Sequence, residues 1–233
     1  IKSKQQYKLI YYETLNSFGL LSAFAMAKLS LIILAVLVYT SICSARNVGT
    51  HPIIPFKQGP CVPASVVMKN FEPVKFFSGI WYERSSFEND LTEEDGICSG
   101  MKSKIVGDKV VVLFYHFESF VLNKYTFIKG EANLNDTSKA SFPLAVKYDT
   151  TSTQELPIRI IDTDYENYAI LYSCRPVPGS STLNDEMAWT FTRKRGDDTN
   201  DRLVDKILKS STLDPAKFTR YGPMTCPADE PIL

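Results

Sequence analysis

Short runs that alternate between apolar and polar residues occupy most of the chain between Gly79 and Arg195. A period of two is typical of β-strands, and Gly, Asp and Asn residues separate the runs as turn residues do. Eight strands are predicted, at residues 79–87, 97–106, 109–117, 122–134, 141–149, 157–164, 167–174 and 187–194. The short links between them indicate an all-β antiparallel meander, folded as a sandwich or as a barrel, and closure into a barrel removes exposed strand edges.

Alternation within the strands predicts which side chains share a face. In the first strand, one face comprises Trp81, Glu83, Ser85 and Phe87. In the last strand, one large apolar face ends in an arginine and comprises Met187, Trp189, Phe191 and Arg193. The strand at 109–117 is apolar on both faces, so we expect other parts of the protein to cover it on both sides.

One amphipathic helix follows the strands. Its apolar stripe has helical spacing and comprises Leu203, Val204, Ile207 and Leu208. Asp198 is a suitable N-cap residue with Asp201 three residues later, and the segment from Ser210 to Pro215 ends the helix. A single helix with one apolar face is expected to pack against the outside of the strands.

The N-terminal part has the features of a secretory signal. Met26 is the first methionine, and it is followed by Lys28, by an apolar run over residues 29–39 and by the small residues Ser44 and Ala45. A positive start, a short apolar run and small residues at the cut are typical of a cleaved signal peptide. We therefore expect cleavage after Ala45.

This cleavage site predicts the organisation of the chain. Residues 26–45 are the signal peptide, residues 46–233 form a single secreted domain, and residues 1–25 are an upstream extension outside the native protein. The alternative is one membrane anchor over residues 18–39, but Lys28 interrupts it.

The cysteines agree with export to an oxidising compartment. Four follow the predicted cleavage site, and these are Cys61, Cys98, Cys174 and Cys226. An even number in a secreted protein predicts two disulfides, and the sequence alone leaves three pairings open. Asn135-Asp136-Thr137 is a glycosylation sequon in a turn-rich stretch, which is consistent with an exposed loop of an extracellular protein.

Composition and motifs exclude several classes of function. The chain of 233 residues is 44% apolar, which is enough for one domain with its own core. Its 26 basic and 26 acidic residues balance, and no basic stripe indicates a nucleic-acid surface. The sequence has no nucleophile elbow, no CxxC, no zinc-spaced His/Cys set and no Gly-rich phosphate loop. We therefore predict that the protein is not an enzyme and holds no metal.

Three segments together carry a family resemblance. Residues 70–83, with Gly79-Ile80-Trp81, are similar to the first sequence motif of lipocalins. Residues 163–169 resemble the second motif, and residues 189–193 resemble the third. The chain therefore resembles lipocalins, with most similarity to the invertebrate bilin-binding and apolipoprotein D-like branch. This resemblance implies an eight-stranded antiparallel up-and-down β-barrel with one C-terminal α-helix packed on the outside.

The resemblance also implies structural roles. Trp81 would enter the closed end of the barrel from the first strand, and Arg193 would arrive from the last strand and lie over the indole. The other motif residues with structural roles are Gly79, Thr163, Asp164 and Tyr165. The resemblance pairs the cysteines as Cys61–Cys174 and Cys98–Cys226.

Strand alternation from Trp81 and Trp189, together with the resemblance, predicts the lining of an interior cavity. The predicted lining comprises Phe87, Phe114, His116, Ile128, Leu156, Ile158, Leu171, Ser173, Met187 and Trp189. This mostly apolar set suits an apolar ligand oriented by one or two hydrogen bonds, such as a bilin (biliverdin), a fatty acid or a sterol-like lipid. His116 matches a histidine near the pigment of bilin-binding lipocalins and could hydrogen-bond a pyrrole or a carboxylate. No cofactor is required.

An alternative function is that of a scavenging or interaction lipocalin, which sequesters an amine or binds a protein partner through its loops. Amine binding calls for an acidic group near the mouth, and Asp185 is the candidate on an inward register. Under either function we expect a small-molecule ligand, no nucleic acid and no stable membrane insertion.

Overall fold

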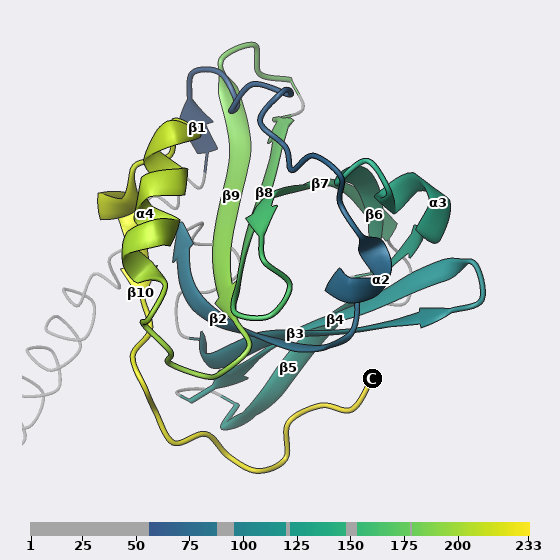
Figure 1. Ribbon diagram of the computed structural model, residues 1–233, viewed down its shortest axis with the longest axis vertical. Coiled ribbons are helices and arrows are strands. Elements are labelled where there is room, and N and C mark those ends of the chain that lie inside the picture. Colours follow the sequence, from purple (N-terminus) through teal and green to yellow (C-terminus); the bar gives the residue numbers. More distant parts are fainter. Residues whose placement is uncertain (1–55, 88–95, 120–121, 148–152, 178) are drawn as a thin grey trace, which may run out of the picture. The chain divides into compact units, whose positions relative to one another are not determined.

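The computed structural model describes residues 56–87, 96–119, 122–147, 153–177 and 179–233 (Figure 1). The predictions for residues 1–45 lie outside the described residues. Eight long strands follow one another along the chain: β2 (Gly79–Phe87), β3 (Gly96–Val106), β4 (Lys109–Glu118), β5 (Lys124–Asn133), β6 (Ser141–Lys147), β7 (Thr153–Thr163), β8 (Tyr168–Pro176) and β9 (Leu183–Thr192). The shorter elements are β1 (Phe56–Gln58), α2 (Pro73–Phe76), α3 (Leu134–Thr137), α4 (Asp201–Ser210), a 3₁₀ turn (Pro215–Lys217) and β10 (Phe218–Arg220).

Each strand from β2 to β8 pairs antiparallel with the next along the chain, and β9 pairs back with β2. This last pairing closes the barrel, so the eight-stranded antiparallel barrel is confirmed. Two short strands extend it, because β1 pairs with β9 and β10 pairs with β2. The sequence analysis did not identify these two strands, since three residues carry too little alternation to be read as a strand.

A β-bulge in β2 overturns part of the predicted facing. Glu83 is opposite Phe191 on β9, but Ser85 is opposite Thr190, so Arg84 is an extra residue without a partner across the strands. An extra residue reverses the side to which all later side chains point. Phe87 is therefore opposite Ala188 on the outer face, where its ring lies 5.8 Å from that of Phe218. The prediction that Ser85 and Phe87 share a face with Trp81 is wrong for this reason.

The helix α4 packs on the outside of the barrel, as expected (Figure 1). Val204 and Leu208 are buried against Ile170, Tyr172 and Ala188 of strands β8 and β9. Leu203, which was assigned to the same stripe, is exposed.

The helix begins at a different residue from the one predicted. Its first residue is Asp201, and Asn200 precedes it as the N-cap, so the assignment of Asp198 as the cap is wrong. No side-chain cap bond marks this end of the helix, but its first residue, Asp201, is in an ion pair. Asp201 accepts two hydrogen bonds from the Arg84 guanidinium, at 3.1 and 2.7 Å, and one from Arg220 at 2.9 Å. Arg84 of β2 and Arg220 of β10 therefore hold the start of the helix.

Both disulfides implied by the resemblance are present. Cys61–Cys174 attaches the N-terminal segment to β8, and Cys98–Cys226 attaches the C-terminal tail to β3. The tail covers the outer face of β3 to β5, where Met224 and Cys226 pack on Tyr115, Phe117 and Tyr125. This contact confirms that the strand apolar on both faces is covered on both sides.

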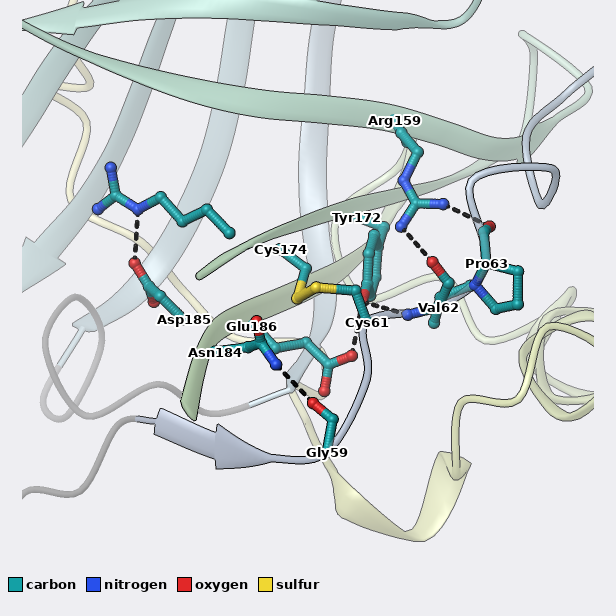
Figure 2. The surroundings of a disulfide bond; sticks show 11 residues. Gly59, Cys61, Val62, Pro63, Arg159, Tyr172, Cys174, Asn184, Asp185 and Glu186 are labelled. Carbon is teal, nitrogen blue, oxygen red and sulfur yellow. Dashed lines mark hydrogen bonds and ion pairs between the residues drawn. A yellow bond between two sulfur atoms is a disulfide. The ribbon is translucent and has the colours of Figure 1, made fainter. Parts of the chain in front are cut away.

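A buried network surrounds the first disulfide (Figure 2). The Tyr172 hydroxyl accepts a hydrogen bond from the Val62 N–H at 2.8 Å and donates one to Glu186 at 2.6 Å. The Arg159 guanidinium lies 4.5 Å from the Tyr172 ring centroid and donates to the Val62 and Pro63 carbonyls. These contacts hold residues 61–63 against the outer face of the barrel.

No helix among the described residues is long and apolar enough to cross a membrane.

Candidate functional site

Aromatic side chains seal one end of the barrel. The short helix α2 lies there, and the Trp81 indole N–H donates to the Phe76 carbonyl at 3.0 Å. Trp81 and Phe76 are both fully buried, and their rings lie 5.6 Å apart. Phe77 packs on Phe76 and on Phe142 of β6, which extends the aromatic layer across the floor. The result is a floor of packed aromatic rings at this end of the barrel interior.

Arg193 joins this floor to the loops around it. Its guanidinium carbon lies 3.5 Å from the Trp81 ring centroid, and it donates to the carbonyls of Ser78 at 2.6 Å, Ile80 at 3.1 Å and Tyr165 at 3.1 Å. Burial lowers the pKa of Arg193 to about 10, so the side chain stays charged at neutral pH. A planar group with five N–H donors suits this set of carbonyls in a way that a lysine ammonium does not.

Backbone geometry explains why a glycine occupies position 79 and an aspartate occupies position 164 in the β7–β8 loop. Gly79 has a φ of +71°, which favours glycine, and it is the first residue of β2, the strand that carries Trp81. In the loop, Asp164 Oδ1 accepts hydrogen bonds from the backbone N–H groups of Glu166, Asn167 and Tyr168 at 3.1, 2.7 and 3.1 Å. Desolvation raises the pKa of Asp164, but the side-chain amide of Asn167, which donates to Asp164 Oδ2 at 2.7 Å, and these backbone bonds together outweigh it and leave the pKa below its usual range.

Above the floor, the barrel contains a cavity of about 230 Å³. Seven of the ten residues predicted to line a cavity surround it, and these are Phe114, His116, Ile128, Leu156, Ile158, Met187 and Trp189. The cavity is also lined by residues that the prediction did not include, namely Glu83, Ser99, Gly100, Tyr115, Thr126, Phe127 and Phe191. Alternation was sufficient in β7 and β9, because these strands present every second residue to the cavity, whereas β4 contributes three consecutive residues.

The structure does not bring the other three predicted residues to the cavity. Leu171 and Ser173 are opposite Trp189 and Met187, so they point inward, but they are packed into the barrel core. Phe87 lies on the outer face beyond the bulge described above.

Polar groups meet the cavity on one side. His116 Nε2 and the Thr126 hydroxyl lie 2.9 Å apart on neighbouring strands β4 and β5. Glu83 in β2 is only 7% exposed and shares an inward face with Trp81, a signal that the sequence did contain. Ser99 could not be placed from alternation, because the β3–β4 register shifts between Ile97 and Gly100.

Asp185 is not among the residues that line this cavity. It keeps the register of Met187 along β9, and its carboxylate accepts a hydrogen bond from Arg175 Nε at 3.0 Å. A role for Asp185 in amine binding stays a prediction. Among the described residues, no three His, Cys, Asp or Glu side chains are grouped as metal ligands would be.

Comparisons with known proteins agree with this architecture. A family model described as Nitrophorin matches residues 61–233. Apolipoprotein D of Macaca fascicularis is 31% identical over 176 residues, which are 74% of this chain and 87% of that protein. Insecticyanin-B of Manduca sexta is 27% identical over 150 residues, 61% of this chain and 69% of that protein. Among solved structures, apocrustacyanin C1 superposes with a TM-score of 0.60 at 18% identity, over 75% of this chain and 94% of that one.

Proposed function

Because the chain belongs to the lipocalin family, through the nitrophorin model and the similarity to apolipoprotein D, we propose that it carries a small hydrophobic molecule in its barrel. The observation that supports this function most directly is the cavity above the Trp81 floor. Its walls are largely aliphatic and aromatic, and burial of apolar surface at about 25 cal/mol per Å² would supply most of the binding free energy.

The size of the cavity bears on the candidate ligands. About 230 Å³ lies below the range of roughly 300–1,000 Å³ that is common for small-molecule pockets. A bilin such as biliverdin, a fatty acid and a sterol-like lipid are the candidates that follow from the resemblance to bilin-binding lipocalins. A compact ligand fills this space without moving the walls, whereas the four rings of a bilin require more room. His116 would donate or accept the orienting hydrogen bond.

The proposed setting is extracellular. Two disulfides fit an oxidising compartment, and Asn135, the proposed glycosylation site, is exposed on α3. A signal peptide at residues 26–45 would direct the chain there. The proposed activity is carriage and not catalysis.

Native mass spectrometry of the protein secreted by eukaryotic cells tests the carrier function. We expect a non-covalent mass to travel with the protein and to be lost on denaturation, and visible absorbance would identify a bilin. An Ile158→Phe variant, which fills the cavity, should lose the extra mass, whereas Leu203→Phe on the exposed face of α4 should keep it. The proposal would be contradicted if the secreted protein carries no additional ligand mass and also binds neither biliverdin nor fatty acids when they are added.

A further inference from the structure

The pairing between strands β2 and β3 ends partway along the barrel. Its last pair is Tyr82 with Gly100, and further along β2 the same edge is occupied by β10, because β9 pairs with the other edge. The next residues, Glu83 in β2 and Ser99 in β3, therefore lie on strands that no longer pair with each other. We call the region between Glu83 and Ser99 the seam.

The seam separates two spaces. The ligand cavity lies on its inner side and a small hollow lies on its outer side, and Glu83 and Ser99 line both. The hollow is also lined by one cysteine, one arginine and three residues of the C-terminal tail: Cys98, Arg195, Tyr221, Gly222 and Met224. The barrel wall is therefore a single layer of side chains at the seam, and the tail covers this layer from outside.

The tail comprises residues 221–233, all of which the structure describes, and none of them is in a helix or a strand. It runs from β10 along the outside of β3 to β5 (Figure 1). The Cys98–Cys226 disulfide joins it to β3 directly beside the seam, because Cys98 precedes Ser99. Farther along, the Tyr125 hydroxyl donates a hydrogen bond to the Pro227 carbonyl at 3.0 Å.

A second attachment of the tail is electrostatic. The Glu230 carboxylate forms ion pairs with Arg195 and, at 3.5 Å, with Lys102 of β3, and it accepts a hydrogen bond from the Tyr115 hydroxyl at 3.0 Å. Lys102 Nζ also donates to the Pro231 carbonyl at 2.7 Å. A segment held by one disulfide and by side-chain contacts, without a backbone ladder, opens locally at a lower free-energy cost than the paired strands beneath it.

The start of the tail is held more firmly than the rest. The Tyr221 N–H donates to the Arg84 carbonyl at 2.9 Å, and the Arg84 guanidinium donates to the Tyr221 carbonyl. Gly222 follows directly, it is exposed, and a side chain at its position would meet no neighbouring atom. The tail can therefore turn at Gly222 while β10 and the barrel stay in place.

We propose that the tail is a movable side wall of the ligand cavity, and that ligand enters and leaves through the seam when the tail lifts away. This inference rests on the proposed carrier function for its ligand, and it adds the path of exchange. The Cys98–Cys226 disulfide and Glu230 keep the path closed.

Stopped-flow fluorescence with cis-parinaric acid, a fluorescent fatty acid, measures association and release on the full secreted protein. In a Cys98→Ser/Cys226→Ser variant both rate constants should rise by roughly fivefold or more while Kd stays within about threefold, because a wider entrance speeds both directions. Cys61→Ser/Cys174→Ser, which removes the other disulfide, is the matched control and should keep both rate constants within about twofold of the wild type.

Single-residue variants grade the effect. Glu230→Gln keeps the disulfide but removes both ion pairs of the tail, so both rate constants should rise by a smaller factor. Glu131→Gln removes a carboxylate from the exposed ion pair with Lys109 on β5 and should leave them unchanged. Ser99→Leu, added to the variant without the Cys98–Cys226 bond, narrows the seam and should reverse most of the increase. Unfolding curves verify that each variant is folded.

A measurement without ligand tests the opening itself. Trp189 lines the cavity, whereas Trp81 is fully buried in the floor. Acrylamide is a small neutral quencher, and the quenching constant of Trp189 should rise by about twofold in the variant without the Cys98–Cys226 bond. It should not rise in the variant without the Cys61–Cys174 bond.

The outcomes separate this inference from the carrier function. Equal rate constants in the two disulfide variants overturn the inference and leave the carrier function standing. Faster release with unchanged association and a proportionally weaker Kd does the same, because it indicates a damaged cavity and not a wider entrance. If cis-parinaric acid and biliverdin both fail to bind, the carrier function falls, and acrylamide quenching alone decides whether the tail closes the seam.

Discussion

The Arg193 guanidinium lies over the Trp81 indole, with 3.5 Å between its central carbon and the ring centroid. The two residues come from the end of β9 and the start of β2, the two strands whose pairing closes the barrel. The contact therefore joins the closure of the sheet to the floor of the cavity, and it places a half-buried cation over an aromatic face and beside three carbonyls that accept its hydrogen bonds.

Replacing Arg193 should destabilise the whole barrel. Arg193→Ala removes the ring contact and leaves the Ser78, Ile80 and Tyr165 carbonyls without that donor, so we expect the free energy of unfolding to fall by about 3 kcal/mol. Arg193→Lys should recover only part of it, because an ammonium cannot reach all three carbonyls. Urea unfolding measures both. Lys109→Ala, in an exposed ion pair, is the control and should change it by less than about 1 kcal/mol.

Asp164→Asn should have an effect that depends on pH. The pKa of Asp164 is lowered in the folded protein, so its carboxylate stabilises the fold above its unfolded pKa of about 4, and this stability is lost as the pH falls through the folded pKa. We expect the wild type to exceed Asp164→Asn by about 1–2 kcal/mol at pH 7 and the gap to close toward pH 3. Urea unfolding across this range measures it, and a gap independent of pH would refute the role of the charge.

Trp189 should report ligand binding, because it lines the cavity, whereas Trp81 is fully buried in the floor. The chain has only these two tryptophans. A bound ligand should quench the fluorescence of the wild type, and Trp189→Phe should remove most of the ligand-dependent change while Trp81 emission persists. If the variant binds with unchanged affinity and is quenched as strongly as the wild type, the ligand does not occupy this cavity.

The two disulfides should protect different segments. Replacing both Cys98 and Cys226 with serine should lower the free energy of unfolding by about 2–4 kcal/mol. It should also speed hydrogen exchange of the tail, which otherwise covers Tyr115 and Tyr125. The matched double replacement of Cys61 and Cys174 should instead speed hydrogen exchange at residues 61–63, because the contacts of Arg159 and Tyr172 alone then hold this segment. Exchange that rises at the same segment in both variants would contradict this separation.

The sequence was sufficient for the features that depend on local pattern or on motif. Alternation located the eight barrel strands, the helical stripe located α4, and the family resemblance implied the Trp81–Arg193 floor and both disulfide pairings, which the cysteines by themselves left open. In β9 the same alternation placed Met187 and Trp189 at the cavity, because that strand runs without an extra residue there, and alternation together with the resemblance placed His116 of β4 there.

Only the tertiary structure decided what depends on pairing between strands. The bulge at Arg84 turned Phe87 outward, and the cavity wall includes Glu83 but not Asp185, whose carboxylate is bonded to Arg175. A strand's own residues specify its alternation, but a bulge arises from how two strands fit each other, and one extra residue reverses every side chain beyond it. For that reason the sequence alone determined the barrel and its floor, and the pairing of β2 with β9 determined which β2 side chains beyond Glu83 face the interior.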